Sequence, residues 1–147
     1  MLCASGTLKK NQRGTSIIEF ALLMPWYFFL VVGAFDLGFY MYALIATQNA
    51  ARVGALYCSS STTAAADSDN ACSYALDQLR GLPNVGTGLS TCLASPLTVT
   101  ASLVAGPDSS NATSVQVTYT TPQLVPIPGL LPGVMTISRT VIMAVRS

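Results

Sequence analysis

A single apolar run, from Ile17 to Phe35, is long enough to cross a lipid bilayer. At about 1.5 Å per residue, a helix of this length matches a hydrocarbon core of about 30 Å. Only Glu19 and Pro25 interrupt the run. A carboxylate inside hydrocarbon costs roughly 2.5–3.5 kcal/mol, so such a residue is seldom kept without a partner. The chain is therefore expected to form a membrane helix, with Glu19 as its first candidate functional residue.

The positive charges around this run predict how it is oriented. Lys9, Lys10 and Arg13 precede it, and the next basic residue is Arg52. The positive-inside rule then places the N-terminus in the cytoplasm and the C-terminal part outside. A cleaved secretory signal is the alternative, but the run exceeds an apolar region of about 7–15 residues and has no Ala-x-Ala site at its end. We therefore predict a retained single-pass anchor that follows a basic cytoplasmic leader, residues 1–14.

The composition argues against several functional classes. The chain has no histidine, and only 9% of its residues are charged. The commonest general base and most zinc-site patterns are therefore missing. A net charge of +1 gives no bulk attraction to nucleic acid. We expect a protein that is not an enzyme, with no catalytic residue, no metal site, no cofactor, no nucleic-acid partner and no small-molecule substrate.

One long helix is predicted from Thr15 to Tyr57, in which the membrane run continues as an amphipathic segment outside the membrane. Such a helix would be roughly 60 Å long, so its second half either projects from the membrane or packs against a soluble domain. Small residues recur along it at steps of four, which lets two helices approach closely. The helix propensity of alanine is the alternative explanation of this spacing. These candidate helix-packing residues are Ala34, Gly38, Ala46, Ala50 and Gly54.

The rest of the chain, residues 58–147, is predicted to be an exported α+β domain. Residues 58–66 are rich in Ser, Thr and Ala and are interpreted as a linker. A second, short helix is expected at about 71–80, with capping residues just before it. Alternating apolar and hydroxyl residues then predict a small antiparallel sheet of about three strands. The expected strands are 97–104, 115–120 and 135–145, and a connection rich in Pro and Gly, 122–133, precedes the last of them.

The cysteines fit an exported domain. Cys3 lies on the cytoplasmic side, whereas Cys58, Cys72 and Cys92 lie where oxidation is permitted. Three is an odd number, so one disulfide and one free thiol are the simplest expectation. We favour Cys72–Cys92, because this pair would tie the second helix to the first strand. Pairs of Cys58 with either of the other two are the alternatives.

The residues around the start of the helix resemble the processing site of type IV prepilins. A short basic leader ends at Gly14, and Glu19 is then the fifth residue of the mature chain. With Glu19-Phe20-Ala21, Pro25, Asp36-Leu37-Gly38 and Ala50-Ala51-Arg52-Val53-Gly54-Ala55, the first 55 or so residues resemble the TadE-like family of the tight-adherence (Flp) pilus system. Thr15 departs from the aromatic residue or Met that is common at the first mature position of major pilins.

The resemblance implies a pseudopilin or minor pilin that acts in pilus assembly and surface adhesion. It implies cleavage between Gly14 and Thr15 by a prepilin peptidase, and roles for Glu19 and Phe20 in assembly and register. The implied location is the bacterial inner membrane, with a periplasmic C-terminal domain and incorporation into the pilus left open. The implied partners are the prepilin peptidase, other pilin-like subunits and inner-membrane assembly-platform proteins.

Two alternatives stay open at this point. Glu19 could be an interfacial carboxylate that reaches back towards Lys10 or Arg13. The whole protein could also be an uncleaved membrane-anchored periplasmic binding or scaffold module. Cleavage after Gly14 separates this alternative from a pseudopilin, because a tethered module needs no such cut.

Overall fold

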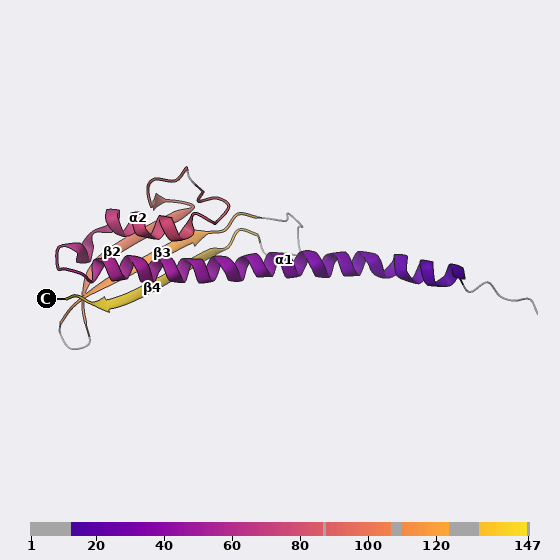
Figure 1. Ribbon diagram of the computed structural model, residues 1–147, viewed down its shortest axis with the longest axis horizontal. Coiled ribbons are helices and arrows are strands. Elements are labelled where there is room, and N and C mark those ends of the chain that lie inside the picture. Colours follow the sequence, from indigo (N-terminus) through magenta and orange to yellow (C-terminus); the bar gives the residue numbers. More distant parts are fainter. Residues whose placement is uncertain (1–12, 87, 107–109, 124–132, 147) are drawn as a thin grey trace, which may run out of the picture. The chain divides into compact units, whose positions relative to one another are not determined.

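The computed structural model describes residues 13–86, 88–106, 110–123 and 133–146 (Figure 1). The chain forms two compact units, Met1–Phe35 and Asp36–Ser147. Helix α1, Arg13–Cys58, begins in the first unit and ends in the second. The long N-terminal helix predicted from the apolar run is thereby confirmed. Residues 1–12 of the predicted leader and 124–132 of the predicted proline-rich connection lie outside the described residues.

The first unit contains the apolar half of α1. Pro25 lies inside the helix without ending it. Proline removes one helical hydrogen bond, a loss that membrane helices tolerate. An apolar sequence and a helix that continues through the whole segment are the two properties that a single membrane-spanning segment requires.

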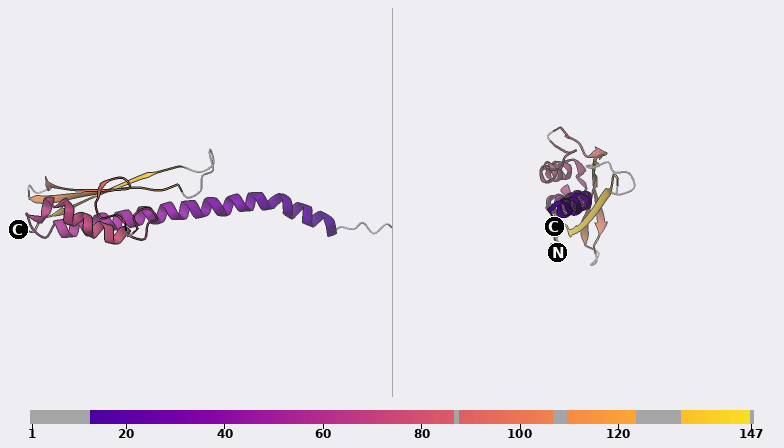
Figure 2. Two further views of the ribbon diagram at one scale, coloured as in Figure 1. Left: turned by 90° about the horizontal axis from the view of Figure 1, so that it is seen from above. Right: turned by 90° about the vertical axis from the view of Figure 1, so that its right-hand side faces the viewer.

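The second unit is an α+β fold made of the end of α1, two further helical segments and an antiparallel sheet. The helices lie on one face of the sheet (Figure 2). The strand order is β1-β2-β3-β4, with every neighbouring pair antiparallel. The elements after α1 are the 3-10 helix η1 (Ala64–Ala66), α2 (Ser68–Leu79), β1 (Leu93–Ala94), β2 (Leu97–Ala105), β3 (Asn111–Thr120) and β4 (Thr136–Ala144).

The expectation of three strands was wrong, because the sheet has four. The additional strand, β1, has only two residues, Leu93 and Ala94, which pair with the start of β2. A pair of residues is too short to show the alternation that reveals a strand in a sequence. The ends of β2 and β4 lie within one residue of the predicted ranges, whereas β3 begins at Asn111, four residues before its predicted start.

Helix α2 begins at Ser68, three residues before its predicted start. Asp67 caps it, since its carboxylate accepts a hydrogen bond of 3.0 Å from the backbone N–H of Asn70. An acidic N-cap satisfies one of the unpaired N–H groups at a helix start. The hydrogen bonds from Asn70 hold the pKa of Asp67 below its ordinary value. The predicted linker before it contains η1, whose Ala64 and Ala65 are buried.

The core lies between the sheet and the helices. On β3 the buried side chains alternate, with Val115, Val117 and Tyr119 facing the helices. The helices contribute mostly small residues, so helices and sheet can approach closely. The helical core residues include Ala43, Ala46, Ala50, Ala51, Ala55, Ala71, Ala75, Leu76 and Leu79.

The opposite face of the sheet carries hydroxyl and amide side chains. Ser138 illustrates this face, because it makes hydrogen bonds of 3.1 Å with both Gln116 and Thr118. A sheet with one buried and one solvated face produces the alternating pattern that the sequence shows.

Candidate functional site in the anchor helix

The residues predicted for processing and register lie at the start of α1. Gly14 and Thr15 belong to its first turn, and the side chains that the structure describes begin at Ser16. Glu19 is exposed, and 65% of Phe20 is accessible. The structure thus places Glu19 and Phe20 on the surface of the helix, where another molecule can reach them. The alternative partners of Glu19, the side chains of Lys10 and Arg13, lie outside the described part of the chain.

The helix around Glu19 has an apolar surface in every direction. Trp26 is 70% exposed and Phe35 is 71% exposed, although both are large apolar side chains. Such a continuous apolar surface is unusual for a soluble monomer and marks contact with lipid or protein. Among the described residues, α1 is the one helix that is long and apolar enough to cross a membrane, and its apolar stretch contains no buried residue. The prediction of a single candidate membrane anchor is therefore confirmed.

The small residues of α1 fall into two groups. A Cβ atom added at Gly38 would meet nothing within 4 Å, and Ala34 is also exposed. By contrast, Ala46, Ala50 and Gly54 are buried within the second unit.

Gly54 shows how tightly the second group is packed. A Cβ atom at this position would lie 3.3 Å from Cγ1 of Val115 on β3 and 3.7 Å from the carbonyl oxygen of Ala71 on α2. The missing side chain thus lets α1 approach both α2 and the sheet inside one chain. The part of either group in assembly with other subunits is still a prediction.

A disulfide joins Cys72 of α2 to Cys92, which comes just before β1. This is the pair that the sequence argument favoured, and it ties the second helix to the edge of the sheet. Cys58, at the end of α1, is buried and free, so the two alternative pairs do not form. Burial raises the pKa of the Cys58 thiol and so favours its neutral form.

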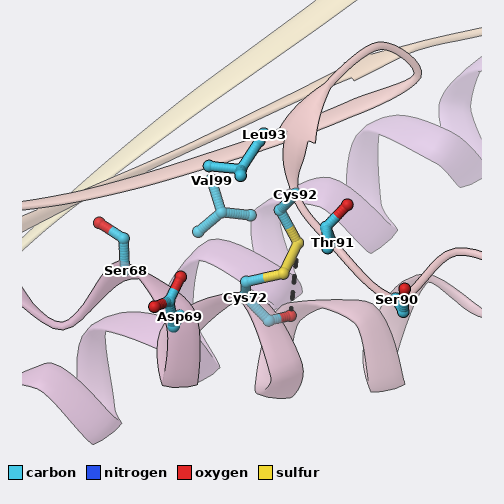
Figure 3. Close-up of a pocket in the computed structure, with 8 residues that line it drawn as sticks. All are labelled: Ser68, Asp69, Cys72, Ser90, Thr91, Cys92, Leu93 and Val99. Carbon is cyan, nitrogen blue, oxygen red and sulfur yellow. Dashed lines mark hydrogen bonds between the residues drawn. A yellow bond between two sulfur atoms is a disulfide. The ribbon is translucent and has the colours of Figure 1, made fainter.

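A cavity of about 230 Å³ opens beside the disulfide (Figure 3). The hydroxyl of Ser68, on its wall, is already engaged by the backbone of Ala101. No group of three His, Cys, Asp or Glu side chains that could hold a metal is found among the described residues. Sequence reasoning missed this cavity, because the chain folds its lining together from three separate segments. The lining residues are Ser68, Asp69, Cys72, Ser90, Thr91, Cys92, Leu93 and Val99.

The comparison with protein families decides what the anchor helix resembles. The family model of TadE-like proteins matches residues 14–56. The TadE-like resemblance is confirmed over this segment. The TadE-like segment covers the predicted cleavage position, Glu19 and nearly all of α1, whereas residues 57–147 lie outside the match. Neither a curated protein nor a solved structure matches the chain.

Proposed function

We propose that the protein is a TadE-like pseudopilin or minor pilin of a tight-adherence (Flp, type IV-like) pilus, and that it acts in pilus assembly and surface adhesion. The family match over residues 14–56 carries this proposal. The match suggests a protein associated with this pilus. The finer role is supported by an exposed acid, Glu19, in the membrane run that follows the predicted cleavage position.

The proposed location is the bacterial inner membrane, with the N-terminus in the cytoplasm and the second unit in the periplasm. The basic residues before the span support this orientation. The Cys72–Cys92 disulfide supports it as well, since disulfides persist in oxidising compartments such as the periplasm.

The proposed assembly step begins with a prepilin peptidase, which cuts between Gly14 and Thr15. Glycine suits this position because it lets another molecule approach the backbone closely. The cut creates a positively charged amine on Thr15. In the proposed assembly, Glu19 of a neighbouring subunit pairs with this amine, and the exposed ring of Phe20 lies at the same contact.

Such a pair would set the register between subunits rather than add much stability. Each charge alone is costly in hydrocarbon, so only the stagger that satisfies both charges is favourable. The proposed partners are accordingly the peptidase, other pilin-like subunits and the inner-membrane assembly platform. The protein acts in this proposal by assembling, not by catalysis.

The proposal predicts that Glu19→Gln leaves membrane insertion intact and lowers pilus yield at least about tenfold, because removing one partner of a buried pair costs about 3–5 kcal/mol. Pilus yield would be measured by quantitative electron microscopy, and insertion by membrane fractionation. Asp36→Asn is the matched control, since it removes one negative charge at the other end of the apolar run. Normal yield in Glu19→Gln would contradict the role given to this carboxylate.

Intact-mass analysis of the protein from native membranes tests the processing step. With the peptidase present, the expected mass is that of a chain beginning at Thr15. An uncut chain in cells that assemble normal pili would contradict the proposal. It would instead favour the membrane-anchored periplasmic binding or scaffold module.

A further inference from the structure

The two edges of the sheet differ in whether their outward-facing backbone groups have hydrogen-bond partners. On the β2 edge, the outward-facing backbone groups of the first half of the strand have partners. Val99 donates its N–H to the carbonyl of Cys92 at 3.0 Å, and Leu97 pairs with Ala94 of β1. The hydroxyl of Ser68 accepts a hydrogen bond of 3.0 Å from the N–H of Ala101 and donates one of 3.5 Å to its carbonyl.

Within Thr136–Ala144 the β4 edge has no such cover in the described part of the chain, and cover begins only beyond the strand, where Arg146 donates its N–H to the carbonyl of Ser59 at 2.9 Å. Thr121 donates its N–H to Met135 at 2.8 Å, and Val145 donates its N–H to Asn111 at 2.9 Å. Because hydrogen-bonded pairs alternate along an antiparallel ladder, the odd-numbered residues of β4 bond to β3, and the even-numbered residues direct their backbone groups outward. These outward residues are Thr136, Ser138, Thr140, Ile142 and Ala144.

Exposed edges are usually protected by lysine or other charged side chains, including charges that point inward, by proline, by a bulge or by a covering segment. The one such device on β4 is the charge of Arg139. Strand β4 contains neither Lys nor Pro, and its pairing with β3 continues without a bulge from Thr136 to Ala144. The right-hand view of Figure 2 shows this strand at the margin of the sheet. Its nine residues therefore present an open ladder that can accept another strand.

Arg139 indicates which kind of side chain a strand that docks on β4 should carry. It lies on β4 opposite Val117, so its side chain belongs to the helix-facing side of the sheet. Its Nε atom is buried, and no hydrogen-bond partner is found for it among the described residues. A buried N–H without an acceptor is costly, and a carboxylate is the acceptor that best matches a guanidinium group.

The described part of the chain supplies no carboxylate to Arg139. The one salt bridge found there joins Asp77 to Arg80. Asp67 is engaged by Asn70 and Tyr57. The described strands contain no acidic residue at all.

We propose that β4 is a docking edge for an extended segment of a different polypeptide, which adds a fifth strand and brings an Asp or Glu side chain to Arg139. Next to Arg139 on the same side of β4 lie Ile137, which is buried, and Val141, which is only half-buried. The docked strand therefore carries apolar residues two positions before and after its acid. A second copy of β4 is a poorer occupant, because it would offer Arg139 no carboxylate. The docking edge lies outside the TadE-like segment, so this inference does not depend on the proposed assembly role of Glu19.

Site-specific photocrosslinking in the full-length protein, in cells that assemble the intact machinery, tests this proposal. The photoreactive residue p-benzoylphenylalanine would replace Thr140 on β4. The matched control carries it at Thr100 on β2, which is also exposed and lies in the same row of the same face, since both residues pair with Gln116. We expect an adduct with the photoreactive residue at Thr140 and none with it at Thr100. Peptide mapping should place the adduct on an extended segment of another protein, with an Asp or Glu within two residues of the crosslinked position.

Two pairs of variants then test the two chemical features of the edge. Ile142→Pro removes an outward N–H that the sheet itself does not use, a substitution that edge strands tolerate, whereas Ile142→Val keeps it. Arg139→Met keeps an unbranched apolar chain of similar reach without the guanidinium, and Arg139→Lys keeps only the charge. We expect the adduct to fall at least about tenfold in Ile142→Pro and Arg139→Met, to be normal in Ile142→Val and to be intermediate in Arg139→Lys.

Retention of the Cys72–Cys92 disulfide in the mass of each variant checks that the second unit has folded. If Ile142→Pro fails this check, the Arg139 variants decide the question. The proposal is overturned by the lack of an adduct at Thr140 or by equal adducts at Thr140 and Thr100. An adduct to lipid, to another copy of this chain or to a segment without an acid overturns it as well.

Discussion

The two halves of α1 are both apolar, yet their residues differ in size. In the first half large side chains such as Trp26 and Phe35 are about 70% exposed. In the second half the buried positions are occupied by small residues, namely alanines, Gly54, Thr47 and Cys58. The difference shows that apolarity alone does not distinguish a helix surface made for lipid from one made for protein. Side-chain size does, because neighbouring helices and strands leave room only for small groups.

The small size of the buried residues in the second half of α1 has an energetic consequence for the second unit. Burying alanine removes little apolar surface from water, and the hydrophobic contribution scales with that surface. A core lined on its helical side mainly by alanines therefore depends on close packing and on the disulfide more than one built from leucines. The first half of α1 has no such dependence, because the surrounding medium would accommodate any large apolar side chain.

The largest effect is expected from removing the disulfide. The double variant Cys72→Ser/Cys92→Ser opens a link across a sequence separation of 20 and should lower the free energy of unfolding of the second unit by about 3 kcal/mol. Urea unfolding of the detergent-solubilised protein, followed by far-ultraviolet circular dichroism, measures this loss. Membrane insertion should be unchanged, because the span has no part in the link.

Cys58→Ala is the control for this experiment, since it removes a buried thiol without breaking a cross-link. It should destabilise the second unit less than the double variant does. Equal losses in the two variants would show that the disulfide adds little beyond its packing.

A smaller effect is expected from enlarging the glycines of α1, and its sign should differ between the two groups of small residues. Gly54→Leu forces a side chain against Val115 and Ala71 and should cost about 1–3 kcal/mol of unfolding free energy. In Gly38→Leu the added Cβ atom meets nothing within 4 Å, and the variant should be neutral or slightly stabilising, because leucine is the better helix former. Thermal unfolding of the two purified variants in one detergent compares them directly. Similar losses in both would mean that the two groups do not differ in packing.

Local pattern was enough to predict most of the fold. The apolar run predicted α1, and alternation of apolar and hydroxyl residues predicted β2, β3 and β4. It could not predict β1, because two residues carry no period. It also did not fix the start of α2, because the run Asp67-Ser68-Asp69-Asn70 offers several capping residues and only the fold shows that Asp67 is the one used.

The candidate sites were predictable to different extents. Glu19 stands out in the sequence because a charge in an apolar run is conspicuous. Arg139 falls in the same alternating row of the sequence as Ile137, Val141 and Val145, so its place on the apolar side of the last strand can be read from the pattern. Its lack of an acceptor could not be read from the sequence, because it depends on which strands are neighbours and on where every carboxylate lies. The cavity beside the disulfide was hidden for the same reason.

The smallest effect at neutral pH is expected from Tyr119, which belongs to the second unit. Its ring is fully buried, its hydroxyl donates a hydrogen bond to Asn84, and Asn84 in turn donates to the carbonyl of Thr120 at 2.8 Å. Burial raises the pKa of Tyr119 to about 12, against about 10 in the unfolded chain. Since the folded state favours the neutral phenol, this contribution is complete below about pH 10 and is lost as the pH rises through about 12.

Urea unfolding of the wild type and Tyr119→Phe between pH 8 and the most alkaline pH that the protein tolerates, roughly 11, tests this contribution. The variant should be slightly less stable at pH 8, because it lacks the hydrogen bond to Asn84, and should lose less stability than the wild type at high pH. Tyr57, whose pKa burial also raises, adds the same alkaline loss to both proteins, so the difference between the two curves isolates Tyr119. Parallel curves would show that the phenol of Tyr119 ionises as readily in the folded protein as in the unfolded chain. The core between sheet and helices would then admit water. Its side chains would be closer in solvent access to the exposed first half of α1 than the close packing of its alanines indicates.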